Sequence, residues 1–249
     1  MDFNAVISSA IPILYEDNHL LIAVKPPNMP VQADSSGDAD MLTLLKAGVK
    51  ERYSKPGEVY LGMVHRMDRP VGGVIAFART SKSAARLSEQ LREHSMRRSY
   101  MAVVRGCADD DGTLRDYLVK DGKTNIVSVT DKDAVGSREA ILRYKRLAAV
   151  DMPEPLSLLG IQLETGRSHQ IRVQFASRGL PLWADARYGT ARIGEAIALW
   201  GHALELIHPT RKETMRFEAP PPEGLPWKWF CVDCVGLRRA EAREDELRV

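Results

Sequence analysis

Short segments with strand character, separated by short links, run through this chain from residue 11 to residue 219. In one of them the side chains of Tyr100, Ala102 and Val104 are separated by single residues, which is the two-residue period of a β-strand. The other segments that favour strands are 11–15, 19–24, 74–78, 113–119, 126–129, 140–147, 156–163, 198–207 and 214–219. Strands joined by short links, with few helices between them, indicate an α+β fold with a mixed, mainly antiparallel sheet.

Three segments with helical signals flank these strands. Met41, Leu45 and Val49 fall at helical spacing after the acidic cap candidates Asp38 and Asp40. The second helix is capped by Thr80, and the third begins at Ser168 and ends at Gly179. Because no repeat, low-complexity tract or linker interrupts the chain, we expect one domain over residues 1–249, with a charged tail at 236–249.

The charge composition limits how this chain can attract a polyanion. Its formal net charge is +2 over 249 residues, so binding of a polyanion must come from local patches. One candidate patch is the segment 81–105, where six Arg and Lys residues stand against Glu89 and Glu93. The alternative interpretation of this segment is a solvated helix face.

The cysteine content favours a reducing compartment. The chain has three cysteines, Cys107, Cys231 and Cys234, and such a sparse, odd set is not a disulfide framework. Cys231 and Cys234 have metal-ligand spacing, but no second pair completes a tetrahedral site, so we expect no metal. The N-terminus has no signal-peptide pattern, and no apolar stretch has the length of a membrane span. We therefore expect a cytoplasmic protein that does not contact membranes and is a monomer.

Two short stretches about a hundred residues apart carry the residues suited to chemistry. Val64-His65-Arg66-Met67-Asp68 sets one carboxylate among three potential cations, His65, Arg66 and Arg69. A carboxylate in such surroundings stays ionised, which suits a nucleophile or a charge stabiliser better than a proton donor. The second stretch, 165–172, sets arginines and a histidine at the expected start of a helix, where backbone N–H groups favour anions. The alternative is a salt-bridge cluster that joins two loops.

Both stretches resemble signature segments of the RluA-type pseudouridine synthases, enzymes that isomerise uridine within RNA. The family's His-Arg-Leu-Asp, followed after two residues by Thr-Ser-Gly, stands here as His65-Arg66-Met67-Asp68 and Val71-Gly72-Gly73. The family's Thr-Gly-Arg-x-His-Gln-x-Arg is complete from Thr165 to Arg172. Further segments that match in order are 21–27, 98–106, 207–210 and 217–220. The resemblance covers residues 12–222 and implies the pseudouridine synthase fold.

The sequence departs from the family pattern at a few positions. Val71 and Gly72 stand in place of Thr and Ser, which removes two hydroxyl groups close to the Asp68 loop. Ala184 precedes Asp185 where the family usually has Gly. Neither departure changes a residue to which the resemblance assigns chemistry.

The resemblance implies roles for named residues. It makes Asp68 the catalytic carboxylate, puts Tyr100 against the uracil, and pairs Arg167 with that carboxylate. It makes Arg66 the side chain that fills the gap left by a flipped-out base. The remaining signature residues, His65, His169, Gln170 and Arg172, are expected to contact RNA or to support Arg167, and Lys25 to shape the pocket rim. Judged by their residue types alone, Tyr100 is equally a core aromatic, Arg167 a phosphate contact and His169 a structural histidine.

The implied activity is isomerisation of uridines to pseudouridine in structured ribosomal or transfer RNA. The reaction oxidises nothing and imports no group, so we expect neither a cofactor nor a metal. One alternative is a catalytically silent RNA-binding module on the same scaffold. Another is a metal-dependent RNA hydrolase, which scarce clustered acids disfavour.

Overall fold

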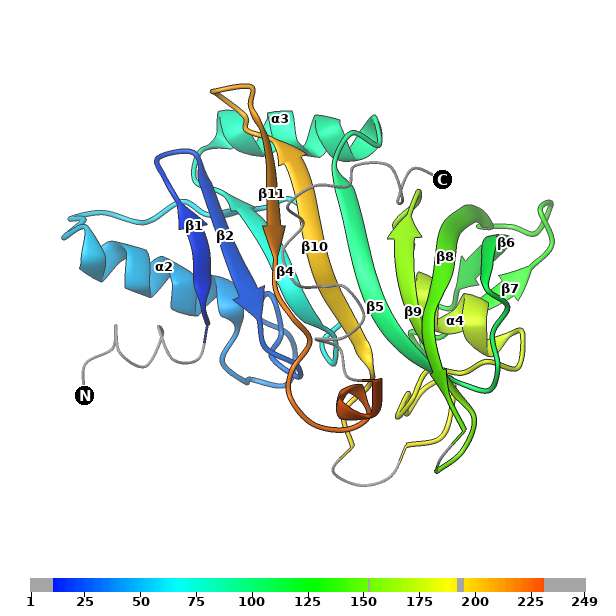
Figure 1. Cartoon of the computed structure of the whole chain (residues 1–249). Coiled ribbons are helices and arrows are strands. Elements are labelled where there is room, and N and C mark those ends of the chain that lie inside the picture. Colours follow the sequence, from blue (N-terminus) through cyan, green and yellow to red (C-terminus); the bar gives the residue numbers. More distant parts are fainter. Residues whose placement is uncertain (1–10, 152, 192–194, 231–249) are drawn as a thin grey trace.

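The computed structural model describes residues 11–151, 153–191 and 195–230, and a single sheet runs through them (Figure 1). Its strands are β1 (Ile13–Glu16), β2 (Leu20–Lys25), β3 (Gly62–Met63), β4 (Gly72–Ala78), β5 (Arg97–Arg105), β6 (Asp111–Lys120), β7 (Val127–Thr130), β8 (Arg138–Val150), β9 (Leu156–Leu163), β10 (Leu199–Ile207) and β11 (Thr214–Glu218). They follow the order β1-β2-β4-β10-β5-β9-β8-β6-β7, with β11 paired to β10 and β3 paired to β4. Only β4 and β10 pair in parallel among these strands, so the predicted mixed, mainly antiparallel sheet is confirmed.

Three α-helices and one 3-10 helix accompany the sheet in the described part of the chain. They are α2 (Met41–Arg52), α3 (Ser81–Arg92), α4 (Gln170–Ala176) and the 3-10 helix η1 (Trp227–Phe230). Two of the predicted caps are confirmed, because Asp40 accepts from the N–H of Thr43 at 3.0 Å and Thr80 accepts from the N–H of Ser83 at 3.1 Å. The third helix is shorter than the predicted 168–179, because it begins at Gln170 after His169, which forms no side-chain cap, and ends at Ala176. Figure 1 shows α2 beside β1 and β2 at one end of the sheet and α4 beside β8 and β9 near the other.

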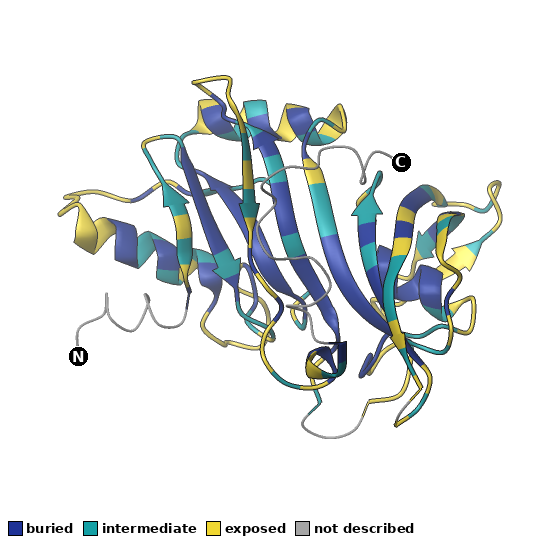
Figure 2. Ribbon diagram, viewed as in Figure 1, coloured by how far each residue is buried: buried dark blue, intermediate teal, exposed yellow. Residues whose placement is uncertain are grey.

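Strand β4 lies at the centre of the packing and is buried on both faces (Figure 2). Val74 and Ala76 pack on one face with Trp200, while Ile75 and Phe77 pack on the other with residues of α2. A strand buried on both faces needs a continuous apolar run rather than alternation, which is the pattern at 74–78. No helix in the described residues is both long and apolar enough to cross a membrane.

Two glycines let β4 approach β10 closely. Gly73 has a φ of +128°, and a Cβ there would collide with the backbone of Gly201. A Cβ on Gly72 would overlap the Trp200 ring, whose indole N–H donates to the carbonyl of Ala219 at 2.9 Å. Gly72, where the resembled family has Ser, therefore leaves room for the Trp200 ring beside the loop that contains Asp68.

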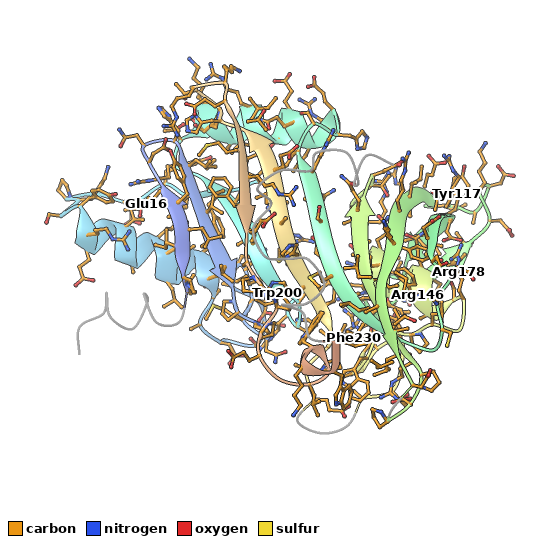
Figure 3. The ribbon with its side chains drawn as sticks, in the orientation of Figure 1. Glu16, Tyr117, Arg146, Arg178, Trp200 and Phe230 are labelled. Atoms are coloured by element: carbon orange, nitrogen blue, oxygen red, sulfur yellow. The ribbon has the colours of Figure 1, made fainter. Side chains whose placement is uncertain are left out.

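Buried polar contacts fix α4 against the strands β6 and β8. Gln174 is fully buried and donates to the carbonyls of Leu114 (3.3 Å) and Ala140 (3.2 Å). Arg178, which is labelled in Figure 3 and lies just beyond the helix, pairs with Asp116 of β6 at 2.9 Å. Since the signature stretch 165–172 leads into α4, these contacts set where that stretch lies.

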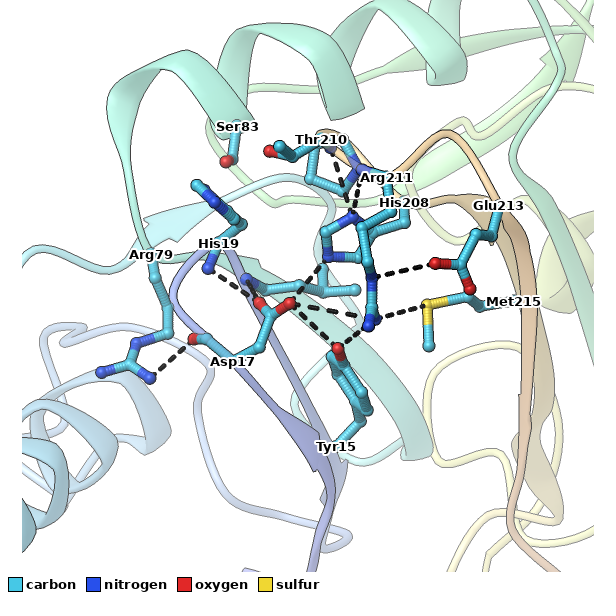
Figure 4. A network of polar contacts seen from close by, with 12 residues as sticks. Tyr15, Asp17, His19, Arg79, Ser83, His208, Thr210, Arg211, Glu213 and Met215 are labelled. Carbon is cyan, nitrogen blue, oxygen red and sulfur yellow. Dashed lines mark hydrogen bonds and ion pairs between the residues drawn. The ribbon is translucent and has the colours of Figure 1, made fainter.

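A second polar network joins the β1–β2 turn to the β10–β11 turn (Figure 4). The Nε2 atom of the fully buried His208 lies 2.9 Å from Asp17, and its Nδ1 accepts from the backbone N–H groups of Thr210 and Arg211. Both ring nitrogens are thus occupied by contacts within the fold. This histidine–aspartate pair therefore connects two turns and has no free nitrogen for chemistry.

Candidate active site

Asp68 lies in the loop between β3 and β4, and a buried lysine holds that loop. The ammonium of Lys25, which is fully buried, donates to the carbonyls of Pro26 (3.1 Å), Arg69 (2.9 Å) and Val71 (2.6 Å). Two of these carbonyls belong to residues that directly follow Asp68. Lys25 was expected at the pocket rim, but it lies beneath the Asp68 loop and fixes its backbone.

The buried ammonium makes stability depend on pH. Burial lowers the pKa of Lys25 to about 7, although the charge of Asp68 works in the opposite direction. A lysine in the unfolded chain keeps its proton up to a pH of about 10.4. Between these values the unfolded chain binds more protons than the folded one, so the free energy of unfolding rises with pH.

We predict that Lys25→Met removes this rise. The wild-type protein should gain about 1–3 kcal/mol relative to the variant between about pH 6 and about pH 9. Urea unfolding of both proteins at the two pH values measures the difference. A stability difference that stays constant or shrinks toward high pH would contradict the buried, depressed lysine.

Three further contacts hold the Asp68 loop and explain which of its residues remain free. His65 accepts from the N–H of Ala76 at 3.2 Å, and Arg69 forms ion pairs with Asp34 (3.5 Å) and Asp38. The tip of Met67 packs so closely on Gly201 that a Cβ there would lie 2.6 Å from it. Arg66 is exposed, and its side chain has no hydrogen bond or ion pair among the described residues.

His65 is therefore not one of the cations that we expected around Asp68, while its expected contact with RNA stays a prediction. Its side chain is buried, and burial together with the charge of Arg98 lowers its pKa to about 3. The imidazole is neutral at physiological pH and serves as a hydrogen-bond acceptor for β4. The positive charge beside Asp68 must come from elsewhere.

That charge comes from Arg172, which joins two carboxylates. Its Nη1 lies 3.1 Å from Oδ2 of Asp68, and its Nε and Nη2 donate to Asp185 at 2.9 and 2.7 Å. Burial works to raise the pKa of Asp185, but hydrogen bonds from Arg172 and from the backbone of Arg187 and Tyr188 outweigh it and lower that pKa. Arg172 is only 5% exposed, and its contact with Asp68 holds that carboxylate in position, while its expected contact with RNA stays a prediction.

Arg167, in contrast, lies apart from the carboxylate. Its Nε donates to the carbonyl of Glu139 at 2.8 Å, and the described structure has no ion pair between Arg167 and Asp68. The expected pairing is corrected, because residue 167 precedes the helix and is exposed. Residue 172 instead lies in α4, packed toward the Asp68 loop.

His169 and Gln170 form the turn that leads into α4. Gln170 is buried, and its side chain accepts from Thr165 (2.8 Å) and from the N–H of Arg167 (3.0 Å) while donating to Ile141 (3.1 Å). It therefore supports the backbone of Arg167, one of the two roles expected for it, while its contact with RNA stays a prediction. His169 has a φ of +53° and places Nε2 3.8 Å from Asp68. Burial lowers the pKa of His169, although Asp68 opposes that shift.

An inner cavity of about 80 Å³ lies next to Asp68 and connects with the outer surface. Tyr100 of β5 lines it together with Asp68, Arg172 and Arg66. Tyr100 is 8% exposed, and burial raises the pKa of its phenol, so the ring is neutral at physiological pH. The cavity thus brings a neutral aromatic ring and a carboxylate to the same space.

A larger cleft of about 1340 Å³ opens from this cavity to the surface. Eight Arg and Lys residues and only three acidic residues line it, although the whole chain carries a net charge of only +2. Among the described residues, four of these basic side chains have no hydrogen bond or ion pair of their own. They are Arg66, Arg92, Arg98 and Lys120. The cleft therefore concentrates positive charge that is available to a polyanion.

This distribution corrects the expected basic patch at 81–105. Arg97 and Arg105 pair with Glu205 and Glu154, and Arg86 donates to the carbonyl of Pro209. From that segment only Arg92 and Arg98 are basic residues of the cleft wall. The remaining unpaired charge comes from Arg66 and Lys120, so tertiary structure and not one segment builds the patch.

The comparisons with known proteins show the family of this chain. Residues 19–177 match the family model described as RNA pseudouridylate synthase. The chain belongs to this family. It is an RNA pseudouridine synthase, an isomerase.

Individual members of the family show how far the similarity extends. The chain is 33% identical over 227 residues to the uncharacterized RNA pseudouridine synthase YhcT of Bacillus subtilis (strain 168), covering 88% of this chain and 73% of that protein. It is 33% identical over 226 residues to ribosomal large subunit pseudouridine synthase C of Escherichia coli (strain K12), covering 86% and 67%. The solved structure of human RNA pseudouridylate synthase domain containing 4 shares the fold, with a TM-score of 0.72 at 19% identity over 88% of this chain and 92% of that one.

Two residues of the site were not recognised from the sequence. Asp185 was noted only as part of a departure from the family pattern, yet it is fully buried and binds Arg172. Ala184 before it has a φ of +54°, which explains why the family usually has Gly there. Tyr188 was noted as part of a family pair, and its hydroxyl lies 2.7 Å from Nδ1 of His169. No three His, Cys, Asp or Glu side chains within the described ranges could hold a metal, and Cys231 and Cys234 lie outside them.

Proposed function

We propose that this synthase converts specific uridines of structured ribosomal RNA into pseudouridine, with Asp68 as the catalytic carboxylate and with no cofactor. The observation that carries the proposal is a positively charged cleft that ends at a carboxylate oriented by Arg172. Relatives named for the large ribosomal subunit, such as the synthase C of Escherichia coli, support ribosomal RNA as the substrate. Transfer RNA is the second substrate to be tested.

The chemistry requires very little besides one carboxylate and a bound base. The bond between N1 of uracil and C1′ of the sugar breaks, the base turns, and a bond forms between C5 and C1′. The proton of C5 is removed and N1 gains one, so atoms and electrons balance without an oxidant or a donor group. This balance is the reason for proposing that no cofactor takes part.

Asp68 can act in either of two ways, by attacking C1′ or by removing a proton from C2′. Both require an ionised oxygen close to the sugar. The ion pair with Arg172 fixes the position of Oδ2, and partial exposure of Asp68 leaves it accessible from the cavity. Tyr100 offers the uracil a neutral ring on which to stack.

The test is formation of pseudouridine in unmodified RNA. Transcripts of large-subunit ribosomal RNA and of transfer RNAs are incubated with the protein, with and without a chelator, and their pseudouridines are mapped. Product at defined uridines of ribosomal RNA, unaffected by chelator, is the expected result. Product in transfer RNA alone would overturn the substrate, loss with chelator would overturn the cofactor-free reaction, and binding without product would indicate a silent RNA-binding protein.

Arg66 is predicted to assist extrusion of the target base. It is exposed, has no side-chain partner in the described part of the chain, and lines both the cleft and the inner cavity, so it can enter the space that a flipped uridine leaves. Unstacking costs on the order of a few kcal/mol, and less where the uridine is already bulged. Arg66→Ala should therefore slow single-turnover reaction on a stacked uridine by about 10–100-fold, and much less on a bulged one.

Two RNAs that differ only in the pairing of the target uridine provide this comparison. An equal loss of rate on both would mean that Arg66 does not act on base extrusion.

Cytoplasmic location and a monomeric state, expected from the sequence, remain predictions.

A further inference from the structure

Like Arg66, Arg98 reaches the inner cavity and has no hydrogen bond or ion pair among the described residues, but Arg66 is exposed whereas Arg98 is half-buried. It lies on β5 two residues before Tyr100, on the same face of the strand, and lines both the cleft and the inner cavity. Within the described residues its side chain makes no hydrogen bond and no ion pair, and its Nε is buried without an acceptor. Its neighbour Arg97 pairs with Glu205, and Arg172 pairs with two carboxylates.

The charge of Arg98 acts on groups that surround the inner cavity. After burial, it is the second cause that lowers the pKa of His65, and it opposes the effect of burial on Tyr100. A guanidinium keeps its proton under all physiological conditions, so it cannot relieve this charge by becoming neutral. A half-buried cation without an anion is costly, and an anionic ligand would offset that cost.

We propose that Arg98 binds a backbone phosphate next to the target uridine and so fixes the nucleotide against Tyr100 and Asp68. This inference rests on the proposed function, because it takes RNA as the ligand of the cleft. A uracil carbonyl would leave the charge of Arg98 uncompensated. A phosphate carries one negative charge and accepts two parallel hydrogen bonds from a guanidinium.

Gly166 of the second signature provides the space that this guanidinium occupies. A Cβ at position 166 would lie 2.7 Å from Nη1 and 2.9 Å from Nη2 of Arg98. The guanidinium therefore lies directly over the glycine, between β5 and the turn before α4. Because the colliding atoms are the end of a flexible side chain, Gly166→Ala should displace Arg98 without unfolding the protein.

The first experiment measures RNA affinity against salt concentration for wild type, Arg98→Gln, Arg98→Lys and Gly166→Ala, with an unmodified large-subunit ribosomal RNA transcript. Loss of one phosphate contact should lower the slope of log K against log salt by about 0.7–0.9. We expect this decrease in Arg98→Gln and Gly166→Ala and not in Arg98→Lys, which keeps the charge. An unchanged slope in Arg98→Gln would overturn the inference.

The second experiment locates the phosphate. Hairpins that contain the modified uridine carry one uncharged methylphosphonate at a time, and wild type, Arg98→Gln and the control Arg92→Gln are compared for binding. At one phosphate that flanks the uridine, the methylphosphonate should weaken RNA binding by wild type and by Arg92→Gln. It should leave RNA binding by Arg98→Gln unchanged. If every methylphosphonate weakened RNA binding by Arg98→Gln as much as it weakened binding by wild type, the proposal would be overturned.

The two experiments separate failure of this inference from failure of the proposed function. The salt measurement needs no product, so it tests the Arg98 contact even if the wild-type protein forms no pseudouridine. Absence of product would count against the proposed function alone. Normal product formation together with an unchanged salt slope in Arg98→Gln would count against Arg98 alone.

Discussion

Asp68→Asn is expected to abolish pseudouridine formation while leaving RNA affinity within about threefold of wild type at fixed salt. The amide has nearly the same shape as the carboxylate and can still accept a hydrogen bond from Arg172, which lies 3.1 Å away. It offers no ionised oxygen, so neither attack on C1′ nor removal of a C2′ proton is possible. Loss of an essential side chain of this kind lowers turnover by about 10³–10⁵-fold.

Single-turnover rates and binding isotherms on the same RNA measure both quantities. Asp34→Asn is the matched control, because Asp34 lines the same cleft but pairs with Arg69 at 3.5 Å. It removes the same charge without touching the inner cavity, and Asp38 still pairs with Arg69 to hold the Asp68 loop, so the rate of Asp34→Asn should stay close to that of wild type. Residual turnover of Asp68→Asn within tenfold of wild type would defeat the assignment of Asp68.

Arg172→Ala is expected to damage both stability and turnover. It leaves Asp185, which is fully buried, without its guanidinium and removes the group that orients Asp68. Removing one partner of a buried ion pair costs about 3–5 kcal/mol. Arg172→Lys should recover only part of this loss, because one ammonium cannot replace the fork that contacts both carboxylates.

Urea unfolding and single-turnover rates of Arg172→Ala, Arg172→Lys and Arg167→Ala provide the comparison. Arg167 is exposed and hydrogen-bonded to a backbone carbonyl, so its removal should change stability by less than about 1 kcal/mol. If Arg167→Ala were the more destabilising variant, or if Arg172→Ala had wild-type stability, the buried network would not be the support of Asp68.

Local signals in the sequence predicted the secondary structure well. The alternation around Tyr100 gave a strand that the structure extends over Arg97–Arg105, and the residues Asp40 and Thr80 cap helices as expected. Such features depend on residues within a few positions of one another, so they can be predicted from the local sequence. The parallel pairing of β4 with β10 joins segments far apart in the sequence, and no local pattern indicates it.

Most residues of the candidate site could also be recognised from the sequence, because they belong to the motif segments. The contacts that these residues make could not be predicted from the sequence. Arg172 pairs with Asp68 across 104 positions of the chain, whereas Arg167, five residues earlier, lies on the outside of the same turn. Which of the two arginines meets the carboxylate depends on how Gln170 and Gln174 pack α4 against the sheet.

The sequence by itself thus determined the strands, the helix caps, the family and the residue types available for chemistry. The tertiary structure decided which charged side chains are paired inside the fold and which remain accessible to RNA. The guanidinium of Arg172 is buried in structural contacts, while Arg66, Arg98 and Lys120 have no side-chain partner among the described residues and line the cleft. The physical reason is that pairing of charges depends on distance and burial in three dimensions, and the net charge of +2 contains no information about either.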